Sequence, residues 1–171
     1  MLRTRKLLYL VLCFAILTVV LIKTGRPLIT SSAPLGVVSW QLAFSETRAR
    51  QVIESWGEEG HRAALNNLIV DFPYLITYTR LLSLLCKSAT HPPNSRLNGL
   101  SAPASRYVWF AALFDAIENI ALLYELEVGV SDLIARIAGV AASVKFSVIA
   151  LALIFLFSSY VSPSKTHSRW P

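Results

Sequence analysis

The stretch YVWFAALFDAIENIALLYEL, residues 107–126, decides the fold class of this chain. It is mostly apolar and about as long as the roughly 20 residues that a helix needs to cross a lipid bilayer. It nevertheless carries Asp115, Glu118 and Asn119, which fall on one side of a helix. We therefore predict a membrane helix whose polar face is turned away from lipid.

The composition places the whole chain in the same class. Hydrophobic residues make up 54% of the 171 residues and charged residues 15%, whereas about 25% of a soluble domain is charged. On length alone, we expect residues 1–171 to form a single integral membrane domain. The net charge of +6 is spread along the chain without a nucleic-acid-binding motif, so we expect no nucleic-acid partner.

Three further apolar stretches complete a set of four candidate spans. They cover about residues 7–23, 65–86 and 137–160. Because lipid cannot satisfy backbone polar groups, each segment must satisfy its own, and we predict an all-α fold, a four-transmembrane-helix bundle. The first stretch could instead be a cleaved signal peptide, but Pro34 after Ala33 would hinder cleavage, so we interpret it as a retained anchor.

The long connection after the first span contains a further helix pattern. In ETRARQVIESW, residues 46–56, apolar side chains recur at i, i+3, i+4 and i+7, namely Ala49, Val52, Ile53 and Trp56. This spacing predicts an amphipathic helix that lies on the membrane surface or caps the bundle. The connection at 127–133 is short, so the third and fourth spans are predicted to be antiparallel neighbours.

The charges around the spans predict the orientation. The amino-terminal tail, the loop at 87–106 and the carboxy-terminal tail contain basic residues and no acidic residue. The basic residues are Arg3, Arg5, Lys6, Lys87, Arg96, Arg106, Lys165 and Arg169. The positive-inside rule then places both termini in the cytoplasm, in a multi-pass protein of the plasma (inner) membrane. Lys23 and Arg26, on the other side, oppose this assignment.

Seven side chains from three of the spans are predicted to form a buried polar network. An ionised group at the bilayer centre costs about 2.5–3.5 kcal/mol even on a lenient scale, so such groups are expected to face one another rather than lipid. Helical spacing puts each set on one face of its own span. The network comprises Asp71, Tyr74, Tyr78, Asp115, Glu118, Asn119 and Lys145.

The expected pairing follows from the charges. Lys145 is predicted to pair with Asp115 or Glu118, while Asn119 and the tyrosine hydroxyls satisfy the remaining oxygens. Three acids against one lysine leave an excess of negative charge, which predicts a shared proton or a bound cation. The alternative is a structural network that specifies which helices pack together.

Two local features bear on helix packing. Small residues recur every four positions in the fourth span and are predicted to let a neighbouring helix approach closely: Ala135, Gly139, Ser143 and Ser147. Pro73 lies near the start of the predicted second span. It is either an ordinary early-helix proline or a kink that shapes a cavity beside Asp71.

Common cofactor and catalytic motifs are missing from the sequence. His61, His91 and His167 all fall outside the predicted spans, which argues against a bis-histidine haem. No zinc-protease, nucleophile-elbow or Walker motif occurs. Glu58 and Glu59 beside His61 are interpreted as partners of a helix dipole rather than metal ligands. We predict no metal site, and neither a cofactor nor catalytic residues can be assigned.

Three motifs carry a resemblance to known proteins. They are LNNLIVDFPYLITYTRLL, FDAIENIALLYEL and ASVKFSVIALAL, with matching residues Asp71, Tyr78, Asp115, Glu118, Asn119 and Lys145. Together they resemble a group of small four-helix integral membrane proteins of bacteria, over about the last two-thirds of the chain. The resemblance implies the same four-helix architecture and no particular activity.

The leading functional hypothesis is a membrane protein whose network binds or relays a proton, an ion or a small ligand. One alternative is a structural accessory subunit of a larger membrane complex. Another is a membrane enzyme that acts on a lipid-soluble substrate. The expected partners are the lipid bilayer and either further copies of the chain or a larger membrane complex.

Overall fold

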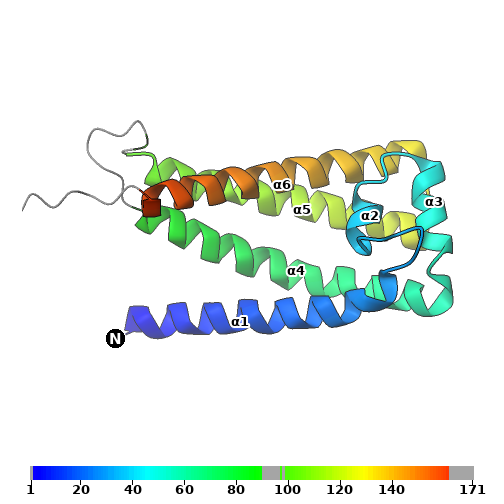
Figure 1. Ribbon diagram of the computed structural model, residues 1–171, viewed down its shortest axis with the longest axis horizontal. Coiled ribbons are helices and arrows are strands. Elements are labelled where there is room, and N and C mark those ends of the chain that lie inside the picture. The colour runs from blue at the N-terminus through cyan, green and yellow to red at the C-terminus, as the bar shows by residue number, and fades with distance from the viewer. Residues whose placement is uncertain (1, 90–96, 98, 162–171) are drawn as a thin grey trace, which may run out of the picture.

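The computed structural model describes residues 2–89, 97 and 99–161, and four long helices dominate them (Figure 1). These are α1 (Leu2–Gly25), α4 (Gly57–Ser88), α5 (Ser101–Glu127) and α6 (Asp132–Val161). The chain also forms η1 (Arg26–Leu28), α2 (Val37–Gln41) and α3 (Glu46–Glu54). Each long helix contains a segment long and apolar enough to cross a membrane. The prediction of an all-α fold with four spanning-length helices is confirmed for the described residues.

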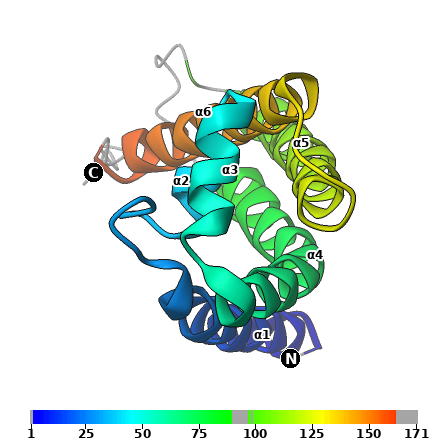
Figure 2. The same ribbon diagram turned by 90° about the vertical axis from the view of Figure 1, so that its right-hand side faces the viewer.

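The four long helices pack in chain order. Helix α1 packs on α4, α4 on α5 and α5 on α6, so that α1 and α6 form the two outer members of the set (Figure 2). Helices α2 and α3 lie across one end of the bundle, and the start of α1 lies at the opposite end (Figure 1). The predicted antiparallel packing of the third and fourth spans is confirmed, since α5 and α6 are joined by a short link and contact each other along their lengths.

Helix α4 begins earlier than the hydropathy of the sequence predicts. It starts at Gly57 rather than near residue 65, because Gly57 adopts φ +60 and redirects the chain into the helix. Pro73 therefore lies in the helix interior, and its interpretation as an early-helix proline is wrong. A proline there cannot donate to the carbonyl one turn earlier. Its own carbonyl accepts a hydrogen bond from the Thr77 hydroxyl at 2.7 Å.

The amphipathic segment forms α3, and its apolar stripe faces the bundle. Ser45 caps the helix by accepting a hydrogen bond from the Arg48 backbone N–H at 3.3 Å. Ala49 and Val52 are fully buried, and the Trp56 indole N–H donates to the Leu28 carbonyl at 2.8 Å. In the structure α3 caps the bundle, which is one of the two placements predicted for this helix. We call α2, α3 and the turn between them (Val37–Glu54) the cap.

The packing of α6 on α5 uses the predicted ladder of small residues only in part. Ala135 of the ladder and Ala138 belong to the buried cluster that contains Leu122 of α5, and Ala152 belongs to the cluster that contains Val108 of α5. Gly139 instead meets the ring of Phe44 from the cap, since a Cβ built there would lie 2.6 Å from that ring. The hydroxyls of Ser143 and Ser147 bond back to carbonyls of their own helix. The spacing of the small residues could not predict whether α5 or the cap would pack against them.

Candidate functional site

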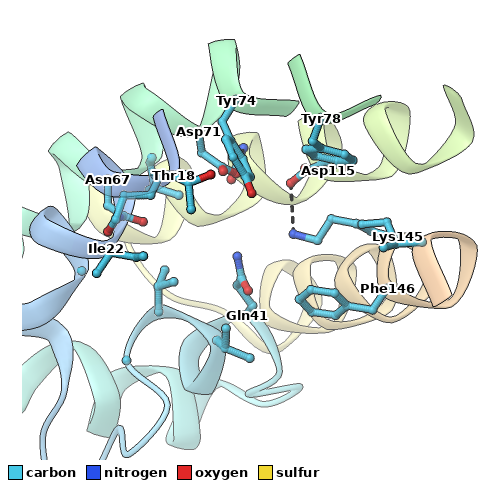
Figure 3. Close-up of a pocket in the computed structure, with 18 of the residues that line it drawn as sticks. Thr18, Ile22, Gln41, Asn67, Asp71, Tyr74, Tyr78, Asp115, Lys145 and Phe146 are labelled. Carbon is cyan, nitrogen blue, oxygen red and sulfur yellow. Dashed lines mark hydrogen bonds and ion pairs between the residues drawn. The ribbon is translucent and has the colours of Figure 1, made fainter. Parts of the chain in front are cut away.

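A cavity of about 890 Å³ lies between α1 and α6, with α4 and α5 behind it (Figure 3). Its wall is mostly apolar, and its volume lies in the range of roughly 300–1,000 Å³ that small-molecule sites occupy. Ile22 on α1 is 57% exposed and Phe146 on α6 is 39% exposed, although both line the cavity. The cavity therefore opens on the outer surface of the bundle between these two helices.

One wall of the cavity carries Lys145, which is paired with two carboxylates. Its Nζ donates to Asp115 Oδ1 at 3.0 Å and lies 2.7 Å from Glu118 Oε2. The three side chains are at most 6% exposed. Two ion pairs so far from water are stable only when their geometry is good, because each ion has lost its hydration. The positive charge of Lys145 is therefore already paired with Asp115 and Glu118.

Two further hydrogen bonds extend the triad to α4. The Tyr78 hydroxyl donates to Asp115 Oδ2 at 2.9 Å, so both oxygens of Asp115 are bonded. The Asn119 side-chain amide donates to Asp71 Oδ2 at 2.8 Å. The Asp71 and Asp115 side chains both line the cavity. If all three acids and the lysine are ionised, the network carries three negative charges against one positive.

Tyr74 belongs to the site through its ring. The ring stacks on Phe14 of α1 with centroids 5.4 Å apart, and it lies 5.5 Å from the ring of Tyr78. Its hydroxyl points into the cavity (Figure 3). The structure thus brings all seven residues of the sequence-derived network together at one depth of the bundle, and it adds an aromatic row beside the carboxylates.

Several buried oxygens of the site have no protein hydrogen-bond partner among the described residues. They include Glu118 Oε1, Asn119 Oδ1 and Gln41 Oε1. Gln41 is only 7% exposed, and its amide projects from α2 into the cavity, facing the carboxylate wall (Figure 3). A buried acceptor without a donor costs about 1–3 kcal/mol. Gln41 and Asn119 line the cavity, so a bound molecule could donate a hydrogen bond to their oxygens, whereas Glu118 does not line it.

Sequence reasoning missed two parts of this region. Gln41 was missed because α2 is five residues long and shows no periodicity. Glu125 was missed, although it follows Glu118 by seven residues on the same face of α5. Its Oε2 accepts a hydrogen bond from the Trp40 indole at 2.6 Å, with both side chains buried. This bond ties the cap to the bundle outside the cavity.

The remaining candidate residues lie away from the cavity. His61 Nε2 is 3.4 Å from Glu127 Oε1 in an exposed pair at the cap end. Glu58 and Glu59 lie in the first turn of α4, where carboxylates favour the helix dipole. Within the described segments, no group of three histidine, cysteine or acidic side chains has the arrangement of a metal site. His91 and His167 lie outside the described residues.

Comparison with known proteins does not assign the chain to a family. No protein-family model matches the chain, and neither a curated protein nor a solved structure matches it. The resemblance to small bacterial four-helix proteins therefore rests on the three motifs alone.

Proposed function

We propose that this protein spans a membrane four times and binds a small amphipathic molecule in the cavity between α1 and α6. The observation that carries the proposal is one cavity that opens on the apolar outer surface and ends at a charged, partly unsatisfied network. A ligand could enter sideways from lipid, place its apolar part against the aliphatic wall and bond its polar end to the network. Sites of this kind combine apolar walls with a few placed polar groups.

The apolar wall favours a small ligand over a proton or a bare ion. The chain of polar contacts stays at one level of the bundle, whereas the aliphatic lining extends from it in both directions along the helices. Beyond the network towards the α4–α5 connection, the wall consists of Leu81, Leu82, Leu85 and Leu153. Such a surface gains free energy by contact with an apolar chain, at roughly 25 cal/mol per Å² removed from water.

The charge distribution supports an orientation for this proposal. We place the cap end outside and the end that holds the start of α1 and the α4–α5 connection in the cytoplasm. The acidic residues outside the spans lie around the cap end, including Glu46, Glu54 and Asp132. Labelling single cysteines in spheroplasts with a membrane-impermeant maleimide tests this. Glu54→Cys should react without permeabilisation and Lys87→Cys only after it, in a background with Cys13 and Cys86 changed to serine. The reverse pattern would contradict the orientation.

Binding is tested with a neutral probe, dansyl-labelled undecanol, and protein in phosphatidylcholine nanodiscs. Directly excited dansyl emission should saturate with one site per chain, above the signal of protein-free discs. Ile22→Trp should weaken binding by at least about tenfold, because the added ring fills cavity space. Ile16→Trp is the matched control, since Ile16 lies on the same helix, is 56% exposed and does not line the cavity.

Two outcomes of this experiment would contradict the proposal. One is no saturable signal above that of protein-free discs. The other is an equal loss of binding in Ile22→Trp and Ile16→Trp, which would place the probe in lipid rather than in the cavity.

The accessory-subunit and enzyme hypotheses remain predictions. Stable co-purification with a larger membrane complex in mild detergent would favour the accessory role, as would an absence of probe binding.

A further inference from the structure

We propose that the cavity selects an organic cation, a molecule with a primary ammonium group on an apolar chain. This inference rests on the proposed binding function and names the chemical class of its ligand. It follows from three features: the charge of the polar network, the acceptors left free in the cavity and the aromatic rings.

The charge of the polar network, rather than that of the whole cavity lining, favours a cation, since Arg26 also lines the cavity. Lys145 is the only cationic side chain in the network, and its Nζ lies within 3.0 Å of both Asp115 and Glu118. One lysine cannot balance three carboxylates. Of these, Asp71 and Asp115 both line the cavity, and among the described residues no ion pair involves Asp71. An ammonium group in the cavity could pair with the Asp71 carboxylate.

The hydrogen-bonding capacity of the wall also matches an ammonium group, which has three donors and no acceptor. Two of the groups left free in the cavity are acceptors. Asp71 uses one oxygen, Oδ2, to accept the Asn119 amide. From the cap, Gln41 adds an Oε1 without a partner within the described part of the chain, while the nitrogen of the same amide lies nearer the carboxylates (Figure 3). A carboxylate ligand could satisfy none of these acceptors and would add a further negative charge.

Aromatic rings complete the polar end of the site. Tyr74 and Tyr78 lie beside Asp71 on α4 (Figure 3), and Phe14 of α1 stacks on the ring of Tyr74. The face of an aromatic ring attracts a cation, most strongly where water is excluded. Carboxylate and ring faces together discriminate an ammonium from a hydroxyl group of similar size. The aliphatic lining beyond the network then receives the chain of the ligand.

The selectivity is tested with three dansyl-labelled undecyl probes that differ only at the far end: ammonium, hydroxyl or carboxylate. Signals are referred to protein-free phosphatidylcholine nanodiscs to remove partitioning into lipid. The wild-type protein should bind the ammonium probe at least about tenfold more tightly than the other two, because a charge-assisted hydrogen bond in a buried site is worth that factor or more. Ile22→Trp should weaken all three.

Variants of single residues locate the selectivity. Asp71→Asn should reduce the ammonium preference to within about threefold, through loss of the charged acceptor. Glu125→Gln is the matched control, because Glu125 is a buried acid of the same bundle that does not line the cavity, and it should keep the preference. If Asp71→Asn does not fold, Tyr74→Leu provides a second test. It should lower ammonium affinity by about threefold more than hydroxyl affinity, since the ring face attracts only the cation.

The outcomes separate this inference from the proposed function. If the hydroxyl or carboxylate probe binds wild type as tightly as the ammonium probe, and Ile22→Trp still blocks binding, the cavity is a binding site but the cation inference is wrong. If Asp71→Asn retains the full preference, the inference is also wrong. If no probe binds saturably, the proposed function and the inference both fail.

Discussion

Lys145 on α6 and Glu118 on α5 form an ion pair with Nζ and Oε2 2.7 Å apart, and the two side chains are 6% and 0% exposed. The pair joins two helices at a depth where water is scarce. A buried ion pair often stabilises a fold no better than apolar side chains of equal size, whereas removing one partner leaves an uncompensated charge. This asymmetry makes the network testable by single and double substitutions.

Lys145→Met should strongly destabilise the protein. The substitution leaves Asp115 and Glu118 buried together without a counter-charge, and breaking such a pair costs about 3–5 kcal/mol. The free energy of unfolding is measured by titration with SDS in mixed micelles. The double variant Lys145→Met with Glu118→Gln should recover a substantial part of the loss. Lys23→Met, at an exposed lysine of α1, is the control and should change stability little. A Lys145→Met protein as stable as wild type would contradict the ionised pair.

Tyr78→Phe should destabilise the protein by a smaller amount. It removes the donor that satisfies Asp115 Oδ2, and an unsatisfied buried acceptor costs about 1–3 kcal/mol. The same unfolding titration measures the change. Tyr124→Phe on α5 is the control, because Tyr124 is 47% exposed and its hydroxyl should contribute within about 0.5 kcal/mol. Equal effects of the two variants would show that the Tyr78 hydroxyl does not support the network.

Glu125→Ala should loosen the cap without unfolding the bundle. The Trp40 indole loses its buried acceptor, and such a loss costs about 1–3 kcal/mol. Hydrogen exchange of the backbone in α2 should accelerate, while exchange in the middle of α5 should not. Glu127→Ala removes the exposed pair with His61 and should have almost no effect, since exposed ion pairs contribute about 0–1 kcal/mol. If hydrogen exchange in α2 is unchanged in Glu125→Ala, the Trp40–Glu125 hydrogen bond does not hold the cap on the bundle.

Gly139→Ala should disturb the docking of the cap on α6. The added methyl group would lie 2.6 Å from the Phe44 ring, and Phe44 is held at φ 57, where its backbone has little freedom to move. Overpacking of this kind costs about 1–3 kcal/mol. The double variant Gly139→Ala with Phe44→Ala should show a non-additive, partly restored stability. Ser147→Ala, at an exposed position of the same helix, is the control. Additive effects would mean that the two residues do not meet.

The core of four spanning-length helices and its polar network could be predicted because both follow from the cost of polar groups in apolar surroundings. Asp115, Glu118 and Lys145 lie in otherwise apolar helices, and contact with one another is what compensates their burial. Helical spacing then sufficed to place Asp71 and Tyr78 on the matching face of α4. The chemistry of each side chain and the period of the helix were enough for this part of the site.

The cap and the cavity could not be predicted, because they depend on contacts between distant parts of the chain. Trp40 and Glu125 are 85 positions apart, and α2 is too short to show a periodic pattern. The start of α4 was missed because its first eight residues are too polar to raise the hydropathy, although they continue the same helix. The small residues around Gly139 were recognised, but their neighbour depends on how the cap folds back over α6.

The cavity as a binding site is tested most directly by photolabelling. Undecanol that carries an alkyl diazirine is photolysed with the protein in nanodiscs, and labelled peptides are mapped by mass spectrometry with and without excess unlabelled undecanol. Labelling that excess undecanol suppresses should occur at cavity residues such as Thr18, Ile22 and Ile149. Labelling at residues exposed on the outer faces of the helices, such as Ile16 and Ile117, should persist under competition. If no cavity residue is labelled competitively, and labels occur only on the outer faces of the helices, the cavity is not a ligand site.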